Sequence, residues 1–166
     1  MLKLATRLVL LAAVIVAGIW AWNYFFPSPQ KVIGRNLLKL AQLASFSAGE
    51  GNFKKLAEME RLRSLLAGNI HVSLDVSEKH PLTFDNREEL VQAALAARSA
   101  VKGLQADFSE INIIVNADRQ SAVAVLVLQA KIAGESEPIV APLKVTLGKI
   151  NGEWLMTRIE PVKALR

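Results

Sequence analysis

Two histidines and two aspartates are the side chains of this sequence that could carry out general acid–base chemistry: His71, Asp75, His80 and Asp107. Asp75 follows His71 by four residues, and in a strand that separation is roughly 13 Å, too far for a hydrogen bond. A general base must lie within about 3 Å of the proton that it takes, or one water away. His71 would therefore need a partner from another strand, such as Asp107 or Glu110. The competing interpretation is that His71 and Asp75 lie on the solvated face of an edge strand.

The other reactive residue types give weaker signals. His80 stands before Pro81 in a polar stretch typical of a loop. The two histidines stand nine residues apart and the carboxylates are scattered along the chain. These spacings match no metal-binding motif. The chain has no cysteine, so it has no disulfide and no thiol chemistry. No glycine-rich phosphate loop or nucleophile elbow is present, and we expect neither a metal nor a cofactor.

The N-terminal segment has the composition of a membrane anchor. Residues 8–26 contain no charged residue and come close to the roughly 20 residues that a spanning helix needs. Lys3 and Arg7 precede the segment, and aromatic residues crowd its far end, where a membrane interface favours them. A cleaved signal peptide is the alternative, but its apolar core is shorter and its cleavage site needs small residues. The aromatic residues are Trp20, Trp22, Tyr24, Phe25 and Phe26.

Charge and composition set the expected location and partners. Lys3 and Arg7 favour a cytoplasmic N-terminus and a globular part in the periplasm or outside the cell, although Lys31 and Arg35 weaken that bias. The net charge is +5, with both signs scattered along the chain, so we expect no nucleic-acid partner. The expected organisation is an anchor at 1–27, a linker at 28–31 and one α+β domain at 32–166.

Two helices are expected after the linker. Residues 31–47 have a 3.6-residue apolar period, with Ile33, Leu37, Leu40 and Ala44 on one face. Residues 52–67 have a similar pattern between two stop signals. In this second helix Asn52 is the expected N-cap, Gly68 follows the C-terminus, and the inward residues are Phe53, Leu56, Met59, Leu62 and Leu66.

The apolar period then changes to two in IHVSLDVS, residues 70–77, which predicts a strand with Ile70 and Val72 facing the core. The DNREEL sequence predicts a helix start with Asp85 as the cap and Glu88 reaching back to it. That helix is expected to run to about Ala100, with inward residues Leu90, Ala94, Leu95 and Val101.

Four antiparallel strands are expected in the remainder. In LQADFSEINIIV, residues 104–115, the apolar parity slips near Ser109 and Glu110, which indicates a β-bulge. SAVAVLVLQAKIA is apolar on both faces over its first half, as an interior strand would be. IVAPLKVTLGKI and WLMTRIEPV are joined at Asn151 and Gly152, a strong hairpin signal. In the last strand one parity set should pack on the helices, and the other, with Arg158 and Glu160, should line a cavity mouth or a dimer face.

This order resembles the nuclear transport factor 2-like superfamily, the cystatin-like cone that SnoaL-like cyclases, ketosteroid isomerase and scytalone dehydratase share. The resemblance covers about residues 31–163 and rests on the paired helices before IHVSLDV, the DNREEL helix start, the bulge at Ser109 and the closing GKINGEWLMTRIE. It implies a curved antiparallel sheet around a helical layer, with a cavity inside the cone. The isomerase-type site pairs a tyrosine with aspartates. The one tyrosine, Tyr24, lies in the apolar segment, so no residue takes over that role.

Three functions follow from the resemblance. We expect a non-catalytic interaction or assembly module, similar to anchored scaffold subunits of type IV secretion systems, with a homodimer through the sheet face or an envelope protein partner. Binding of a small apolar ligand in the cone is an alternative, and an isomerase, dehydratase or cyclase activity is a further one. For Trp154 packing in the core is the favoured role, because aromatic side chains bury a large area, and a ligand contact is the alternative. The cavity-lining candidates are Phe108, Leu126, Leu128, Leu143 and Trp154.

Overall fold

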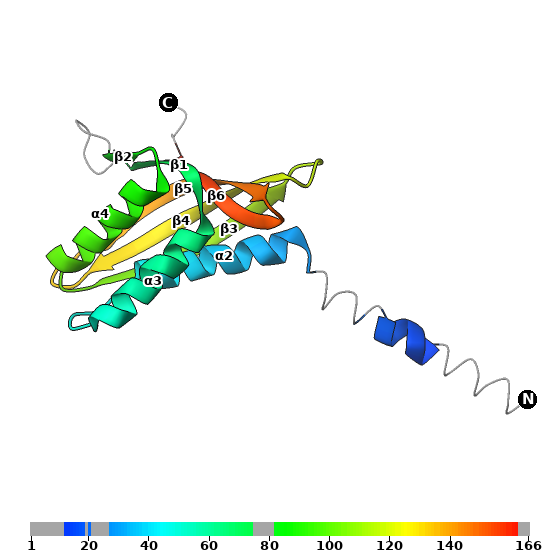
Figure 1. The fold of residues 1–166 in the computed structure, drawn as a ribbon, viewed down its shortest axis with the longest axis horizontal. Coiled ribbons are helices and arrows are strands. Elements are labelled where there is room, and N and C mark those ends of the chain that lie inside the picture. Colours follow the sequence, from blue (N-terminus) through cyan, green and yellow to red (C-terminus); the bar gives the residue numbers. More distant parts are fainter. Residues whose placement is uncertain (1–11, 19, 21–26, 75–81, 163–166) are drawn as a thin grey trace, which may run out of the picture.

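A computed structural model describes residues 12–18, 20, 27–74 and 82–162 of the chain. The elements of the domain follow one another as two helices, a strand pair, a third helix and four long strands (Figure 1). The helices are α2 (Pro29–Ala44), α3 (Asn52–Leu65) and α4 (Arg87–Ala100), and the strands are β1 (Leu66–Leu74), β2 (Leu82–Phe84), β3 (Leu104–Val115), β4 (Ser121–Ile132), β5 (Ile139–Ile150) and β6 (Glu153–Pro161).

The three helices form a layer against one face of a single curved sheet (Figure 1). In α2 the predicted face is confirmed, because Ile33, Leu37 and Leu40 are buried against the sheet. Pro29 occupies the first turn of α2, where its missing N–H is not needed. In α4 the cap is Asn86, one residue after the predicted Asp85: its Oδ1 accepts a hydrogen bond from the Glu89 amide at 2.9 Å.

The predicted inward face of α3 is wrong at its N-terminal end. Met59, Leu62 and Leu65 are buried, but Phe53 is 92% exposed and Leu56 is 62% exposed. Each step of three residues along a helix falls about 60° short of a full turn, so nine residues carry Phe53 to the side opposite Leu62.

The sheet is mixed, which corrects the expectation of an antiparallel one. Its strand order is β2-β1-β6-β5-β4-β3, and β1 runs parallel to β6 while all other neighbours are antiparallel. The parallel pair arises because the chain leaves β1, forms β2 and α4, and returns through three more strands before β6 lies beside β1. β4 is an interior strand, as predicted, and β2 is a short strand that the sequence pattern did not indicate.

Bulges in β3 and β6 bend these two strands. The predicted bulge in β3 is confirmed: the register slips between Ser109 and Asn112, and Glu110 has φ 52°. A second bulge in β6, between Met156 and Arg158, was not predicted. Because of this extra residue Met156 and Ile159 both face the core although their parities differ.

The hairpin that joins β5 to β6 is also confirmed. Asn151 and Gly152 have φ 51° and 87°, the two left-handed positions that an Asn-Gly turn supplies.

The predicted anchor at 8–26 lies mostly outside the described residues, of which 12–18 and 20 fall within it. Among the described residues no helix is both long enough and apolar enough to cross a bilayer.

Candidate ligand-binding cavity

An apolar cavity of about 240 Å³ lies between the helical layer and the sheet. All three helices contribute to its wall, with Leu40 from α2, Met59 from α3 and Ala94 from α4. The sheet closes it from the other side with side chains of β1, β3, β4, β5 and β6. Among the described residues that line the cavity, Arg98 is the only one whose side chain can form hydrogen bonds. The sheet residues include Val72, Ala106, Phe108, Leu128, Leu143 and Ile159.

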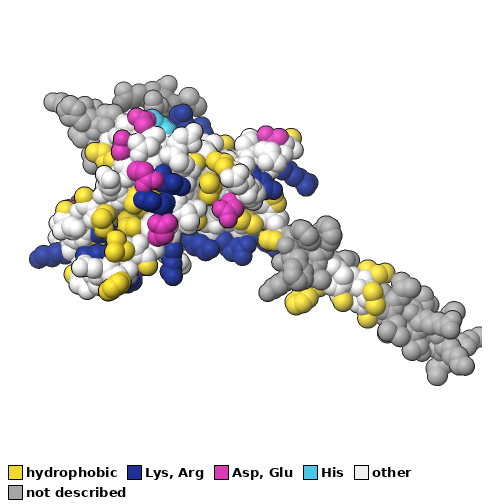
Figure 2. All heavy atoms as spheres, in the orientation of Figure 1, with side chains coloured by type: hydrophobic (Ala, Val, Ile, Leu, Met, Phe, Trp, Pro, Cys, Tyr) yellow, Lys and Arg dark blue, Asp and Glu magenta, His cyan; other side chains and the backbone are white. Residues whose placement is uncertain are grey.

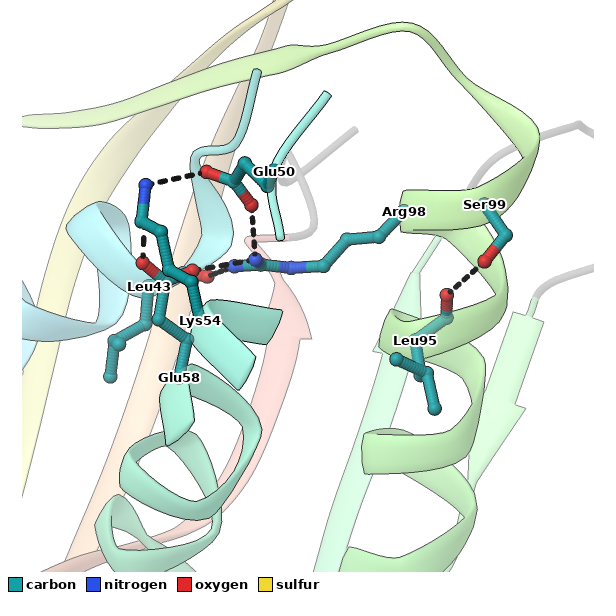
Figure 3. A network of polar contacts seen from close by, with 7 residues as sticks. All are labelled: Leu43, Glu50, Lys54, Glu58, Leu95, Arg98 and Ser99. Carbon is teal, nitrogen blue, oxygen red and sulfur yellow. Dashed lines mark hydrogen bonds and ion pairs between the residues drawn. The ribbon is translucent and has the colours of Figure 1, made fainter. Parts of the chain in front are cut away.

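Arg98 lies in the cavity wall with all its polar contacts directed away from the apolar space. Its Nη1 is 3.0 Å from Glu50 Oε2 and 2.6 Å from Glu58 Oε2, and its Nη2 donates to the Leu43 carbonyl (Figure 3). The guanidinium carbon lies 5.1 Å from the centre of the Phe46 ring. The Arg98 side chain is 2% exposed, so the charge is buried but paired.

Lys54 completes this network at the surface. Its Nζ lies 2.8 Å from Glu50 Oε1 and 3.7 Å from Glu58 Oε1 (Figure 3). The hydrogen bond from Lys54 is the main cause that lowers the pKa of Glu50, and it outweighs the opposite effect of burial. The same bond raises the pKa of Lys54. Two carboxylates and two cations therefore balance one another and join the loop after α2 to α3 and α4.

The structure places three of the five predicted cavity residues at the cavity: Phe108, Leu128 and Leu143. The other two do not line it, which corrects the prediction. Leu126 is 1% exposed and belongs to the packed core nearer the β3–β4 turn. Trp154 is also buried, at the start of β6, where its carbonyl accepts a hydrogen bond from Asn36 Nδ2 at 3.0 Å. Trp154 therefore packs in the core, the role that the sequence favoured for it.

The acid–base candidates are not brought together in the cavity. His71 lies on the outer face of β1, because its neighbours Ile70 and Val72 face the core. Its Nδ1 is 2.6 Å from Asp85 Oδ1, and the side chains of these residues are 35% and 77% exposed. Three strands separate β1 from β3, so the predicted partners Asp107 and Glu110 are wrong.

Asp107 has a local role instead: its Oδ1 accepts a hydrogen bond from the Phe108 amide at 2.8 Å. Asp75 and His80 lie outside the described residues. Within the described ranges no group of three His, Asp or Glu side chains is arranged to hold a metal ion.

Sequence reasoning missed Arg98 and most of the helical lining. A signal for Arg98 was present, because Leu90, Ala94 and Arg98 follow one another at four-residue steps on the inward stripe of α4. A charged residue on an apolar stripe indicates a buried ion pair. The small size of Ala94 and Ala97, which leaves room beside Leu90, gives a further signal.

Comparison with known proteins identifies the fold. No family model matches the sequence, and no curated protein is similar to it in sequence. Solved structures are similar in three dimensions at low sequence identity. A protein of unknown function with a cystatin-like fold from Nostoc punctiforme has a TM-score of 0.60 at 16% identity, over 80% of this chain and 88% of that chain.

Two further structures have the same TM-score. A candidate scytalone dehydratase of Novosphingobium aromaticivorans reaches 0.60 at 16% identity, over 82% of this chain and 84% of that one. A nuclear transport factor 2-like protein of unknown function from Pseudomonas putida reaches 0.60 at 9% identity, over 78% and 82%. The chain therefore has the nuclear transport factor 2-like, cystatin-like fold, as the sequence resemblance implied. At these identities the likeness shows the fold alone.

Proposed function

We propose that this domain binds a small, uncharged apolar molecule in the cavity of the cone without transforming it. The observation that carries the proposal is the 240 Å³ cavity, in which the one described hydrogen-bonding side chain, Arg98, is already committed to Glu50, Glu58 and the Leu43 carbonyl. A charged ligand would lose its hydration there without gaining a free partner.

The size of the cavity limits the ligand. A dry apolar cavity of about 150 Å³ holds benzene. Roughly ten heavy atoms, as in a two-ring aromatic or a medium-length acyl chain, therefore suit a cavity of about 240 Å³. The proposed absence of catalysis is supported by the position of His71 and Asp85, which lie outside the cone.

Filling the cavity tests this function. Ala94→Phe places a ring in the cavity, and it should reduce binding of naphthalene, a neutral and fluorescent two-ring aromatic of the expected size, at least tenfold while the chain stays folded. Ala96→Phe on the exposed face of the same helix is the matched control and should bind as the wild type does. Equal affinity of both variants for naphthalene would contradict the proposal.

The membrane anchoring of the domain and its orientation are also proposals. We infer that residues 8–26 anchor the protein in a membrane with a cytoplasmic N-terminus, so that the domain lies in the periplasm or outside the cell. The uncharged segment, the preceding Lys3 and Arg7 and the aromatic residues at its far end support this arrangement. Because the chain has no cysteine, a single Lys102→Cys can be labelled with a membrane-impermeant thiol reagent on intact cells. The absence of labelling would contradict the orientation.

A second candidate function is assembly through the outer face of the sheet, with a second copy or an envelope protein as the partner. Large apolar side chains are exposed on that face: Ile114 is 59% exposed, Val125 41% and Val140 59%. Sedimentation of the full chain in detergent should then show a dimer that Val125→Lys converts to a monomer. A wild-type chain that stays monomeric at high concentration would contradict the proposed homodimer.

A further inference from the structure

The outward side of α2 carries a stripe of unpaired cations. Lys31, Arg35 and Lys39 follow at four-residue steps, opposite the buried Ile33 and Leu37. α2 contains no acidic residue. None of the three cations has an ion-pair partner within the described residues, whereas several basic residues elsewhere in the domain are paired.

Exposed apolar side chains accompany these cations on the helical layer. Leu38 lies between Arg35 and Lys39 and is 47% exposed, and α3 adds Phe53 and Leu56 at 92% and 62%. Figure 2 shows dark blue side chains along the lower edge of the domain, over α2 and α3. Cations beside exposed Phe and Leu side chains are the combination that suits a bilayer interface, where charge meets headgroups and apolar groups enter the acyl boundary.

A groove brings the two helices together on this side. Lys39 of α2 and Arg61 of α3 line the same groove, together with Gln42 and Ser64. Glu58 also lines it, but its carboxylate is already paired with Arg98 and Lys54. Arg61 also lacks an ion-pair partner among the described residues. A concave basic site between two helices offers several donors to one phosphate group.

We propose that this basic helical surface, formed by Lys31, Arg35, Leu38, Lys39, Phe53, Leu56 and Arg61, lies against the anionic headgroups of a lipid bilayer. Charge complementarity selects anionic lipid, and the position of the surface along the chain brings it to the membrane. Lys31 follows the apolar segment by five residues, which reach at most about 17 Å when extended. This last step rests on the proposed anchor.

The full chain in lipid nanodiscs tests the proposal. A fluorophore on a single Leu38→Cys thiol reports contact with lipids that carry a quencher in the headgroup. We expect severalfold stronger quenching in discs that contain phosphatidylglycerol than in discs of phosphatidylcholine alone. The quenching should fall at about 0.5 M salt, where the screening length is only a few ångströms.

Charge reversal supplies the matched control. Arg35→Glu/Lys39→Glu should abolish the quenching, whereas Lys102→Glu/Lys131→Glu makes the same charge change elsewhere on the exposed surface and should preserve it. Absent quenching in anionic discs, or quenching that the first pair leaves intact, overturns the proposal. If poly-glutamate without lipid changes the fluorescence of the label as much as anionic discs do, the surface binds acidic polypeptides. That result would also overturn the proposal.

The experiment distinguishes a failure of the proposed anchor from a failure of the basic helical surface. A chain that does not stay with neutral discs has no anchor at 8–26. In that case the basic helical surface must bind anionic vesicles on its own, and a chain that does not float with them overturns the inference.

Discussion

Arg98 shows how a single residue can shape an apolar cavity without making it polar. Its guanidinium is buried on the inward stripe of α4, but its contacts point to Glu50, Glu58 and the Leu43 carbonyl at the rim. The aliphatic stem of Arg98 therefore serves as cavity wall while its charge is neutralised. The same network joins three segments that are distant in sequence.

Removing Arg98 should destabilise the domain strongly. Arg98→Leu removes the nearer cation of Glu58 and the second cation of Glu50, and both carboxylates are largely buried. We expect the free energy of unfolding to fall by on the order of 3 kcal/mol. Urea denaturation followed by circular dichroism measures this change. Arg61→Leu, which removes an exposed and unpaired arginine, should change the stability by less than about 0.5 kcal/mol. Equal effects of the two substitutions would show that the Arg98 network contributes little.

The stability of the domain should also decrease at acid pH because of Glu50. The folded-state pKa of Glu50 is lowered from its ordinary value of 4.5, mainly by the hydrogen bond from Lys54. A lowered folded pKa contributes stability that is present above the ordinary pKa and is lost as the pH falls through the folded value. The melting temperature should therefore decrease below about pH 4.5, and Lys54→Met should make that decrease smaller.

Glu160, whose pKa Lys144 lowers in the same way, keeps part of the acid sensitivity in that variant. Lys102→Met, which removes a lysine without an ion-pair partner among the described residues, should leave the pH profile unchanged. An identical profile for Lys54→Met and the wild type would contradict the role of the Glu50–Lys54 pair.

At the scale of elements, the bulge in β3 places a non-glycine residue in a left-handed conformation. Glu110 has φ 52°, which costs an L-residue about 1 kcal/mol relative to glycine. Glu110→Gly should therefore raise the unfolding free energy, and Glu110→Val should lower it. Asp107→Gly, in the same strand but without a positive φ, should be destabilising. Thermal denaturation that ranks Glu110→Gly below the wild type would contradict this account of the bulge.

Local patterns predicted the elements well and their faces less well. The parity slip at Ser109 and Glu110 revealed the β3 bulge, because a change of parity within one strand has no other simple cause. The β6 bulge left no such mark, since Trp154 and Met156 share one parity and Leu155 and Ile159 the other, so either set could be the buried one. The exposed end of α3 was missed because its apolar residues follow at steps of three, a spacing that rotates around the helix.

Across the whole molecule, the sequence predicted an α+β cone but not the pairing that closes it. β1 joins the sheet beside β6 in parallel, and no local pattern distinguishes that partner from an antiparallel one. The same limit applies to the cavity. Phe108, Leu128 and Leu143 could be predicted from their strands, whereas Leu126 and Trp154 have the same pattern but lie where the core is filled.

The position of the reactive residues is also decided by tertiary structure. His71 could be assigned to a strand, but only the strand order shows that Asp107 and Glu110 are too distant to pair with it and that Asp85 is its partner. The candidate site is therefore the apolar cavity with its neutralised arginine, and the His71–Asp85 pair lies outside it.

Native mass spectrometry of the gently purified full chain, released from detergent micelles, tests the central claim most directly. We predict a bound neutral molecule of low mass that leaves on collisional activation, and that is retained by Ala96→Phe and absent from Ala94→Phe. A wild-type chain that is free of ligand, and that takes up no apolar probe of the expected size such as naphthalene when it is offered, would contradict ligand binding in the cone.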